Sequence, residues 1–176
     1  MRLPKVIDDT HYVSQSPKET KNFGEIAGTL LKPGDVLVLT GDLGAGKTQF
    51  TKGVAQGMGV KDEVTSPTFT IEMVYEGTDM PLYHFDLYRL NDEDELEDTG
   101  LFDALGTDGP CLIEWGEQFE DAMGDERVDV IFKRLDADTP AGQEPARSIE
   151  FVPHGARSTE LAFALHARTV SARKED

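Results

Sequence analysis

The feature that most constrains this chain is the octapeptide Gly41-Asp42-Leu43-Gly44-Ala45-Gly46-Lys47-Thr48, which matches G-x-x-x-x-G-K-[ST] at every fixed position. Its glycines allow the backbone to wrap around an anion with several N–H groups pointing inward. Lys47 supplies a charge for the β- and γ-phosphates, and the Thr48 hydroxyl is a ligand for Mg²⁺. The octapeptide predicts a nucleotide site of the P-loop type, and the alternative is a glycine-rich turn.

The flanking sequence predicts the order of strand, loop and helix that a P-loop requires. Residues 36–39 are apolar on both faces, which is typical of a central strand covered on both sides. After the loop, Phe50, Val54 and Met58 recur every four residues, so a helix of about ten residues is expected.

Other patterns predict the remaining elements. Ser16-Pro17-Lys18-Glu19 combines an N-cap serine, a proline at the first helical position and a capping-box glutamate, so a helix is expected from there to Pro33. Strands are expected at 68–75 and 82–88 as an antiparallel hairpin, and at 110–114, 128–132 and 148–152. Short helical turns are expected over 91–105 and a last helix over 158–168. We expect one domain over residues 1–168 and a frayed tail over 169–176.

Charge and composition limit the classes of partner. The 17 Lys and Arg residues against 34 Asp and Glu give a net charge of −17, which repels phosphate backbones and anionic lipid. Extensive direct binding of nucleic acid is therefore disfavoured, and the acidic surface is either simply solvated or suited to a basic protein partner. No stretch is long and apolar enough for a signal peptide or a membrane span, so a cytoplasmic protein is expected. The single cysteine, Cys111, lies in an apolar run and is interpreted as a buried thiol.

Two carboxylates follow predicted strands. Asp86 ends a partly apolar run in the manner of a Walker B aspartate, although a surface aspartate is an equal alternative. Glu114 directly follows Cys111-Leu112-Ile113, so it must be paired, bound to a ligand or placed at the mouth of a cleft. Trp115 beside it is either a core aromatic or a lid over the nucleotide.

Two further segments are open to more than one interpretation. Residues 64–69 contain three hydroxyl side chains around Pro67, which suits either a switch-type loop near the γ-phosphate or an ordinary turn. The acidic cluster at 92–98 is a solvated face in the simplest interpretation, and a metal site or a partner surface in the others.

Four segments, taken together with their order and spacing, resemble the TsaE (YjeE/YdiB-type) family. They are the octapeptide at 41–48, Thr65-Ser66-Pro67-Thr68-Phe69, His84-Phe85-Asp86-Leu87-Tyr88-Arg89-Leu90 and Ile113-Glu114-Trp115-Gly116-Glu117. The resemblance covers residues 10–135. It implies an α/β, P-loop NTPase-like fold with three layers and a mixed parallel and antiparallel central sheet.

The resemblance also implies a function. Proteins of this family are bacterial ATPases that act with the partner proteins TsaD and TsaB to make the threonylcarbamoyladenosine modification beside the anticodon of tRNA. The carbamoyl transfer itself would belong to TsaD, and ATP hydrolysis by this chain would sustain or reset turnover. That division of work suits a chain whose own charge repels tRNA.

Carried onto this sequence, the resemblance implies roles for individual residues. ATP would be bound by Asp42, Gly44, Ala45, Gly46, Lys47, Thr48, Gln49, Thr65 and Trp115. Mg²⁺ would be held by Thr48, Glu114 and Asp86, directly or through water, and the catalytic set would be Asp86, Glu114 and Lys47. Thr65 and Ser66 would lie in a mobile switch loop. Gln49 departs from the family pattern, which often has a second threonine there, and residues after 136 match no pattern.

Other functions remain open from the sequence. A small-molecule P-loop kinase shares the phosphate-binding loop, but no arginine-rich lid is evident. A GTPase would need an Asn-Lys-x-Asp base reader, and neither Asn22 nor Asn91 lies in such a motif. The third possibility is a nucleotide-sensing binding module with little turnover.

Overall fold

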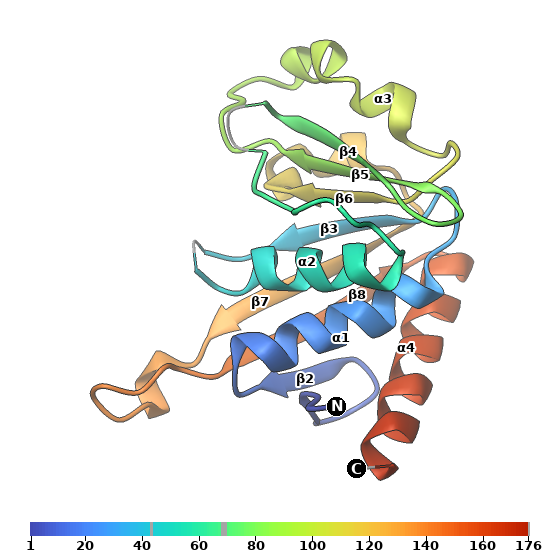
Figure 1. Ribbon diagram of the computed structural model, residues 1–176. Coiled ribbons are helices and arrows are strands. Elements are labelled where there is room, and N and C mark those ends of the chain that lie inside the picture. Colours follow the sequence, from blue (N-terminus) through green and yellow to red (C-terminus); the bar gives the residue numbers. More distant parts are fainter. Residues whose placement is uncertain (43, 68–69, 176) are drawn as a thin grey trace.

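A computed structural model describes residues 1–42, 44–67 and 70–175, and these form an eight-stranded sheet flanked by helices (Figure 1). The strand order is β1-β2-β8-β7-β3-β6-β5-β4. The strands are β1 (Lys5–Val6), β2 (His11–Ser14), β3 (Val36–Thr40), β4 (Glu72–Glu76), β5 (Pro81–Asp86), β6 (Cys111–Glu114), β7 (Arg127–Arg134) and β8 (Arg147–His154).

The sheet is mixed, as the sequence predicts. β3 runs parallel to both β6 and β7, and β5 runs parallel to β6. The remaining pairs, β4 with β5, β7 with β8, β8 with β2 and β2 with β1, are antiparallel. The expected α/β fold with a mixed central sheet is therefore confirmed, and so is the antiparallel pairing of the hairpin formed by β4 and β5.

Helices cover both faces of the central strands. The longer helices are α1 (Pro17–Leu30), α2 (Lys47–Gly57) and α4 (Ala156–Lys174). The short ones are the 3₁₀ turns η1 (Glu93–Thr99), η2 (Gly116–Met123) and η3 (Asp136–Asp138) and the single turn α3 (Leu101–Ala104). Figure 1 shows α1 and α2 side by side against the sheet, with α4 crossing it near the chain termini.

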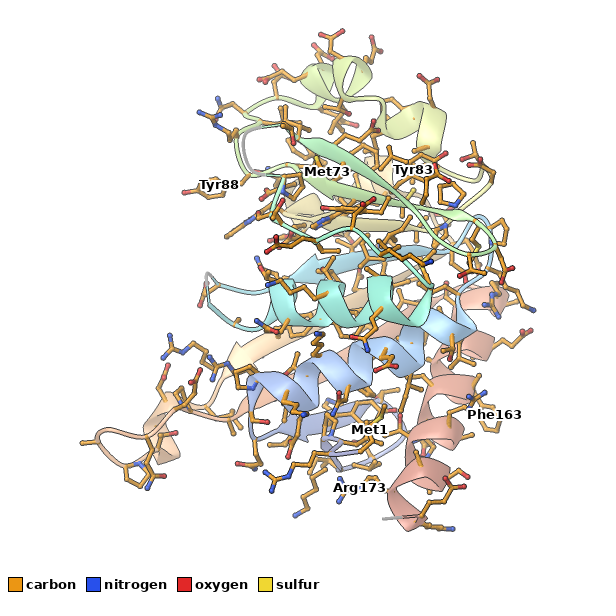
Figure 2. All side chains as sticks on the ribbon, viewed as in Figure 1. Met1, Met73, Tyr83, Tyr88, Phe163 and Arg173 are labelled. Carbon is orange, nitrogen blue, oxygen red and sulfur yellow. The ribbon has the colours of Figure 1, made fainter. Side chains whose placement is uncertain are left out.

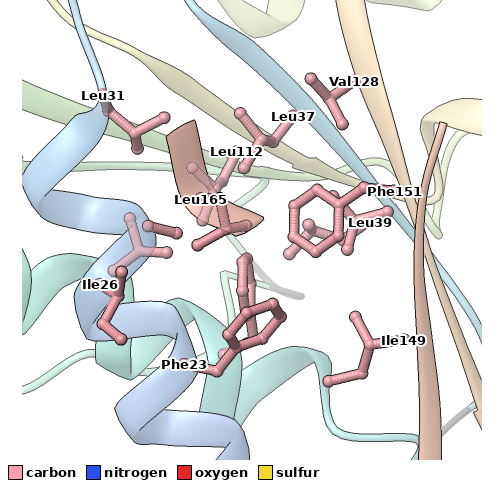
Figure 3. Close-up of a cluster of buried hydrophobic side chains, with 14 of the residues drawn as sticks. Phe23, Ile26, Leu31, Leu37, Leu39, Leu112, Val128, Ile149, Phe151 and Leu165 are labelled. Carbon is pink, nitrogen blue, oxygen red and sulfur yellow. The ribbon is translucent and has the colours of Figure 1, made fainter. Parts of the chain in front are cut away.

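The core has two parts, one on each face of the sheet. Leu37 and Leu39 of β3 point into a cluster with α1, α2 and α4, in which Phe23, Phe151 and Leu165 meet (Figure 3). Val36 and Val38 point into the opposite cluster, together with η1, α3 and η2. Successive residues of a strand point to opposite faces, so β3 is buried on both sides, as its uniformly apolar sequence predicts.

α1 and α2 approach each other through glycines. A Cβ atom added to Gly24 would lie 2.2 Å from the carbonyl oxygen of Phe50, and one added to Gly53 would lie 1.9 Å from that of Lys21. Both distances are far shorter than a van der Waals contact, so only glycine permits this spacing. Close packing against α1 fixes α2, the helix that follows the P-loop, relative to the sheet.

Several expected boundaries are wrong. α4 runs to Lys174 instead of ending at Arg168, because Thr169 is fully buried and the Arg173 guanidinium donates to the carbonyls of Leu3 and Pro4 at 2.8 and 2.7 Å. The tail expected to fray is therefore helical up to Lys174. β4 begins at Glu72, after a turn over 70–71, and the first residues predicted for this strand, 68–69, lie outside the described residues. β7 and β8 are each longer than expected, at eight residues.

Candidate active site

The sheet topology brings three strand ends together at one edge. β3, β5 and β6 are parallel, and their registers pair Leu39 with Glu114 and Asp86 with Glu114. Because the carboxyl ends of parallel strands meet at the same edge, Asp86 and Glu114 lie side by side there, next to the loop that leaves β3. This is the position in which open α/β sheets bind ligands.

The P-loop has the backbone conformation that its glycines allow. Gly44 and Gly46 have φ values of 78° and 111°, in the left-handed region that other residues avoid. Gly46 is the N-cap of α2, and no side chain of the described residues caps this helix end. The amides in the first turn of α2 are therefore available to an anion at the positive end of the helix dipole.

Lys47 contacts both the P-loop backbone and Trp115. Its Nζ donates to the carbonyl oxygen of Gly41 at 2.6 Å and lies 4.2 Å from the centroid of the Trp115 ring. Trp115 has a φ of 62°, which is uncommon for a bulky residue and often marks a functional site. Its ring is tilted against that of Tyr88, with centroids 5.0 Å apart. Tyr88 projects from the same end of the molecule as the P-loop (Figure 2).

Asp86 joins the second predicted segment to the site. Its Oδ2 accepts a hydrogen bond from the Ser66 hydroxyl at 3.3 Å, and its Oδ1 accepts from the Tyr88 amide at 3.0 Å. The neighbouring Thr65 exchanges hydrogen bonds with the Tyr75 hydroxyl through its amide and its carbonyl, at 3.2 and 3.3 Å. The segment expected to act as a switch is thus tied to β4 and β5, and its residues 68–69 lie outside the described part.

Glu114 is held by a histidine. His84 Nε2 lies 2.8 Å from Glu114 Oε2, and both side chains are buried, at 2% and 6% exposure. Of the three alternatives that the sequence leaves open for Glu114, the structure shows two, because Glu114 is paired with His84 and lines a pocket. His84 belongs to the segment that carries the family resemblance, but its sequence position gave no indication of this contact.

A pocket of 660 Å³ collects most of the predicted site residues. Its lining includes Gly44, Gly46, Lys47, Thr48, Gln49, Asp86, Glu114 and Trp115. Three predicted ligand residues do not line it: Ala45 is buried under the loop, whereas Asp42 and Thr65 are exposed outside the pocket. Leu43, within the octapeptide, lies outside the described residues.

The structure also adds residues that the sequence interpretation missed. Arg147, at the start of β8, lines the pocket and donates to the carbonyl oxygen of Gly44 at 3.1 Å. It also forms an ion pair with Glu144 at 3.1 Å. Ser16 and Thr20, near the start of α1, line the same wall. No local pattern marks Arg147 as a pocket residue, because the pairing of β8 in the sheet brings it to the loop.

Comparison with known proteins agrees with this architecture. Residues 14–143 match the family model "Threonylcarbamoyl adenosine biosynthesis protein TsaE". The chain is 48% identical to the tRNA threonylcarbamoyladenosine biosynthesis protein TsaE of Bacillus subtilis over 123 residues, which is 70% of this chain and 77% of the relative. The corresponding protein of Treponema pallidum is 42% identical over 123 residues, 70% of this chain and 90% of the relative.

A solved structure agrees as well. The crystal structure of Bacillus subtilis YdiB superposes with a TM-score of 0.71 at 36% identity, covering 94% of this chain and 95% of that one. In the described part of the chain, no helix is both long and apolar enough to cross a membrane. Family model, relatives and solved structure are in accord, and the chain belongs to the TsaE family of threonylcarbamoyladenosine biosynthesis proteins.

Proposed function

We propose that this protein binds Mg-ATP in the P-loop pocket and hydrolyses it to ADP and phosphate, in support of a TsaD-TsaB complex that modifies tRNA in the cytoplasm. The observation that carries the proposal is that the groups needed to bind a magnesium nucleotide lie in one pocket. The uncapped start of α2, the Lys47 ammonium and the carboxylates of Asp86 and Glu114 all reach the same pocket.

The donor set suits Mg²⁺. Thr48, Asp86 and Glu114 line one pocket, so a hydroxyl and two carboxylates are available to a hard cation. No group of three or more His, Cys, Asp or Glu side chains among the described residues forms a closed metal site. Mg²⁺ is usually held by one or two carboxylates together with phosphate oxygens and water, so an open set of this kind fits it. Bound there, the ion would neutralise charge on the phosphates.

The chain's own residues supply phosphate binding and orientation. Lys47 would exchange the Gly41 carbonyl oxygen for phosphate oxygens, a stronger, charge-assisted contact. The amides of the loop and of the first turn of α2 would bind the remaining oxygens. Asp86, which accepts from Ser66 and from the Tyr88 amide, would support the metal or orient the attacking water.

Membership of the TsaE family supports a role in a tRNA modification that other proteins complete. The net charge of −17 favours work through protein partners over direct contact with tRNA. TsaD and TsaB are the partners that the resemblance implies, and in this scheme the carbamoyl transfer takes place on TsaD.

One assay separates this proposal from a kinase and from a nucleotide sensor. Phosphate release from ATP and from GTP is measured with the chain alone and with TsaD and TsaB added. We expect release from ATP that rises when both partners are present. Transfer of the γ-phosphate to a small acceptor would instead identify a kinase, and tight binding of ATP without release of phosphate would identify a sensor.

A further inference from the structure

His84 is a buried polar side chain to which neither the motif nor the proposed mechanism gives a role. It lies in β5, between Leu82 and Asp86 on the same face of the strand, and is buried. Its Nε2 contacts Glu114 Oε2 at 2.8 Å. Its Nδ1 is buried and has no hydrogen-bond partner among the residues that the structure describes.

The strand geometry explains why this histidine reaches Glu114. β5 and β6 are parallel with Asp86 opposite Glu114, and His84 opposite Leu112. Alternation along each strand therefore places His84, Asp86 and Glu114 on one face, the face covered by α2. His84 approaches Glu114 diagonally from inside the sheet, while Asp86 lies beside it at the pocket edge.

The direction of the hydrogen bond follows from the two groups. An ionised carboxylate can only accept, so His84 Nε2 carries the hydrogen and donates it to Oε2. In the neutral ring Nδ1 then carries the lone pair, and this tautomer leaves no N–H of the ring buried without a partner. A donor aimed at a single oxygen fixes the rotation of the Glu114 carboxylate.

We infer that His84 is a positioning residue for the magnesium site: it holds Oε2 of Glu114, so that the carboxylate presents its remaining oxygen to the pocket. This inference rests on the proposed function, because Glu114 is a metal ligand only under that proposal. Ligating side chains are generally oriented by such outer partners, whose removal costs about 10- to 100-fold in metal affinity or activity. A purely structural role, in which His84 only satisfies a buried carboxylate, would affect folding but not the requirement for Mg²⁺.

Two substitutions at one position separate these roles. The side-chain amide nitrogen of glutamine can occupy the place of Nε2, so His84→Gln keeps a donor for Glu114. The shorter asparagine places its amide near the former Nδ1, so His84→Asn leaves Glu114 without that donor. The chain offers a matched control, because His166 in α4 also has a buried Nδ1 without a described partner and lies 3.6 Å from Asp9, away from the pocket.

Calorimetry gives the Mg²⁺ concentration at which the affinity for ADP is half-maximal, and a kinetic assay gives the Mg²⁺ concentration at which the rate of ATP hydrolysis is half-maximal. Thermal unfolding shows whether each variant is folded. For His84→Asn we expect the Mg²⁺ requirement to rise about 10- to 100-fold in both assays. At saturating Mg²⁺, the kcat of His84→Asn should return close to the wild-type value, although the variant needs more Mg²⁺ to reach it. His84→Gln should restore a requirement close to that of the wild type, and His166→Asn should leave it unchanged.

A second measurement covers the case in which His84→Asn does not fold. Imidazole nitrogen spectra of the wild-type chain report the tautomer of His84, and we expect the Nε2–H form, with resonances that shift when Mg²⁺ joins bound ADP. The opposite tautomer, or resonances that ignore Mg²⁺, would overturn the inference. So would a folded His84→Asn variant with an unchanged Mg²⁺ requirement. If the wild-type chain binds no magnesium nucleotide, the proposed function itself fails, which is a different result.

Discussion

At the scale of single residues, the predictable part of the site is the part that a motif defines. Lys47, Thr48, Asp86 and Glu114 follow from the octapeptide and from carboxylates that end strands, and all four line one pocket. The partners that hold those residues could not be predicted in the same way. The contact of Glu114 with His84 depends on a diagonal between two strands that are 30 residues apart in sequence.

Glu114 gives the most direct prediction at this scale. Replacing it by alanine removes a buried carboxylate from the proposed metal site, and we expect turnover of ATP to fall by about 10²-fold, as loss of a preorganised electrostatic group does. Steady-state hydrolysis across a range of Mg²⁺ concentrations measures the change, with Glu117→Ala as the control, because Glu117 is exposed and does not line the pocket. Full Mg²⁺-dependent turnover in the Glu114 variant would exclude it from the site.

Cys111 gives a prediction about pH. Burial, with a smaller contribution from the nearby carboxylate of Glu72, raises the pKa of its thiol to about 12. An unfolded thiol ionises near about 8.5, so the folded state favours the protonated form. The resulting stability is fully present below about pH 8.5 and is lost as the pH rises from there towards 12. The free energy of unfolding of the wild type and of Cys111→Ala, compared between pH 7 and 10, should converge as the pH rises, and a constant difference would contradict this account.

At the scale of elements, local signals predict where helices begin better than where they end. The expected N-cap at Ser16 is present, with the Ser16 hydroxyl accepting from the Glu19 amide at 3.2 Å, but the Glu19 carboxylate accepts from the amide of Gln15, one residue before the N-cap, so the capping box does not close on Ser16. The sequence pattern predicts an end of α4 at Arg168, six residues too early, because the burial of Thr169 and the contact of Arg173 with the N-terminal segment extend the helix to Lys174. Both are tertiary contacts, which the hydrophobic periodicity of the helix sequence cannot predict.

The glycine contacts between α1 and α2 give a prediction for an element pair. In an isolated helix, Gly53→Ala would be favourable by about 1 kcal/mol. Here the new Cβ would lie 1.9 Å from the backbone oxygen of Lys21, which cannot move aside alone, so the helices must separate. Overpacking of this kind costs about 1–3 kcal/mol or more and outweighs the gain in propensity.

Chemical denaturation tests that prediction, with Lys52→Ala on the same helix as the control. We expect a lower free energy of unfolding for Gly53→Ala and a change within about 0.5 kcal/mol for Lys52→Ala. A Gly53→Ala variant as stable as the wild type would show that α1 and α2 do not need their present spacing.

At the scale of the whole molecule, the sheet order decides which segments reach the site. The α/β class and its mixed sheet could be predicted, because a P-loop follows a buried parallel strand and the hairpin after it is antiparallel. The placement of β8 between β7 and β2 could not, because it depends on pairing between segments more than 100 residues apart. That pairing carries Arg147 to the carbonyl oxygen of Gly44.

Arg147 therefore provides a test of the long-range architecture. Its side chain is 13% exposed and joins β8 to the P-loop, so we expect Arg147→Ala to weaken binding of Mg-ADP by roughly tenfold, the effect of one lost charge-assisted contact. Arg134 is opposite Arg147 in the sheet register but does not line the pocket, and its alanine variant should bind as the wild type does. Equal affinities of the two variants for Mg-ADP would show that β8 does not contribute to the nucleotide site.

The central claim, a triphosphate site at the start of α2, is tested most directly by calorimetry of the purified chain. Mg-ATP or a non-hydrolysable analogue is titrated into the wild type and into Lys47→Ala, with Trp115 fluorescence recorded in parallel. We predict heat of binding and a fluorescence change in the wild type, because Trp115 lies 4.2 Å from the Lys47 ammonium in the pocket. In Lys47→Ala we predict greatly weakened binding, because the charge that would contact the phosphate oxygens is lost. A wild-type chain that gives no heat with any adenine nucleotide in the presence of Mg²⁺ would contradict the account.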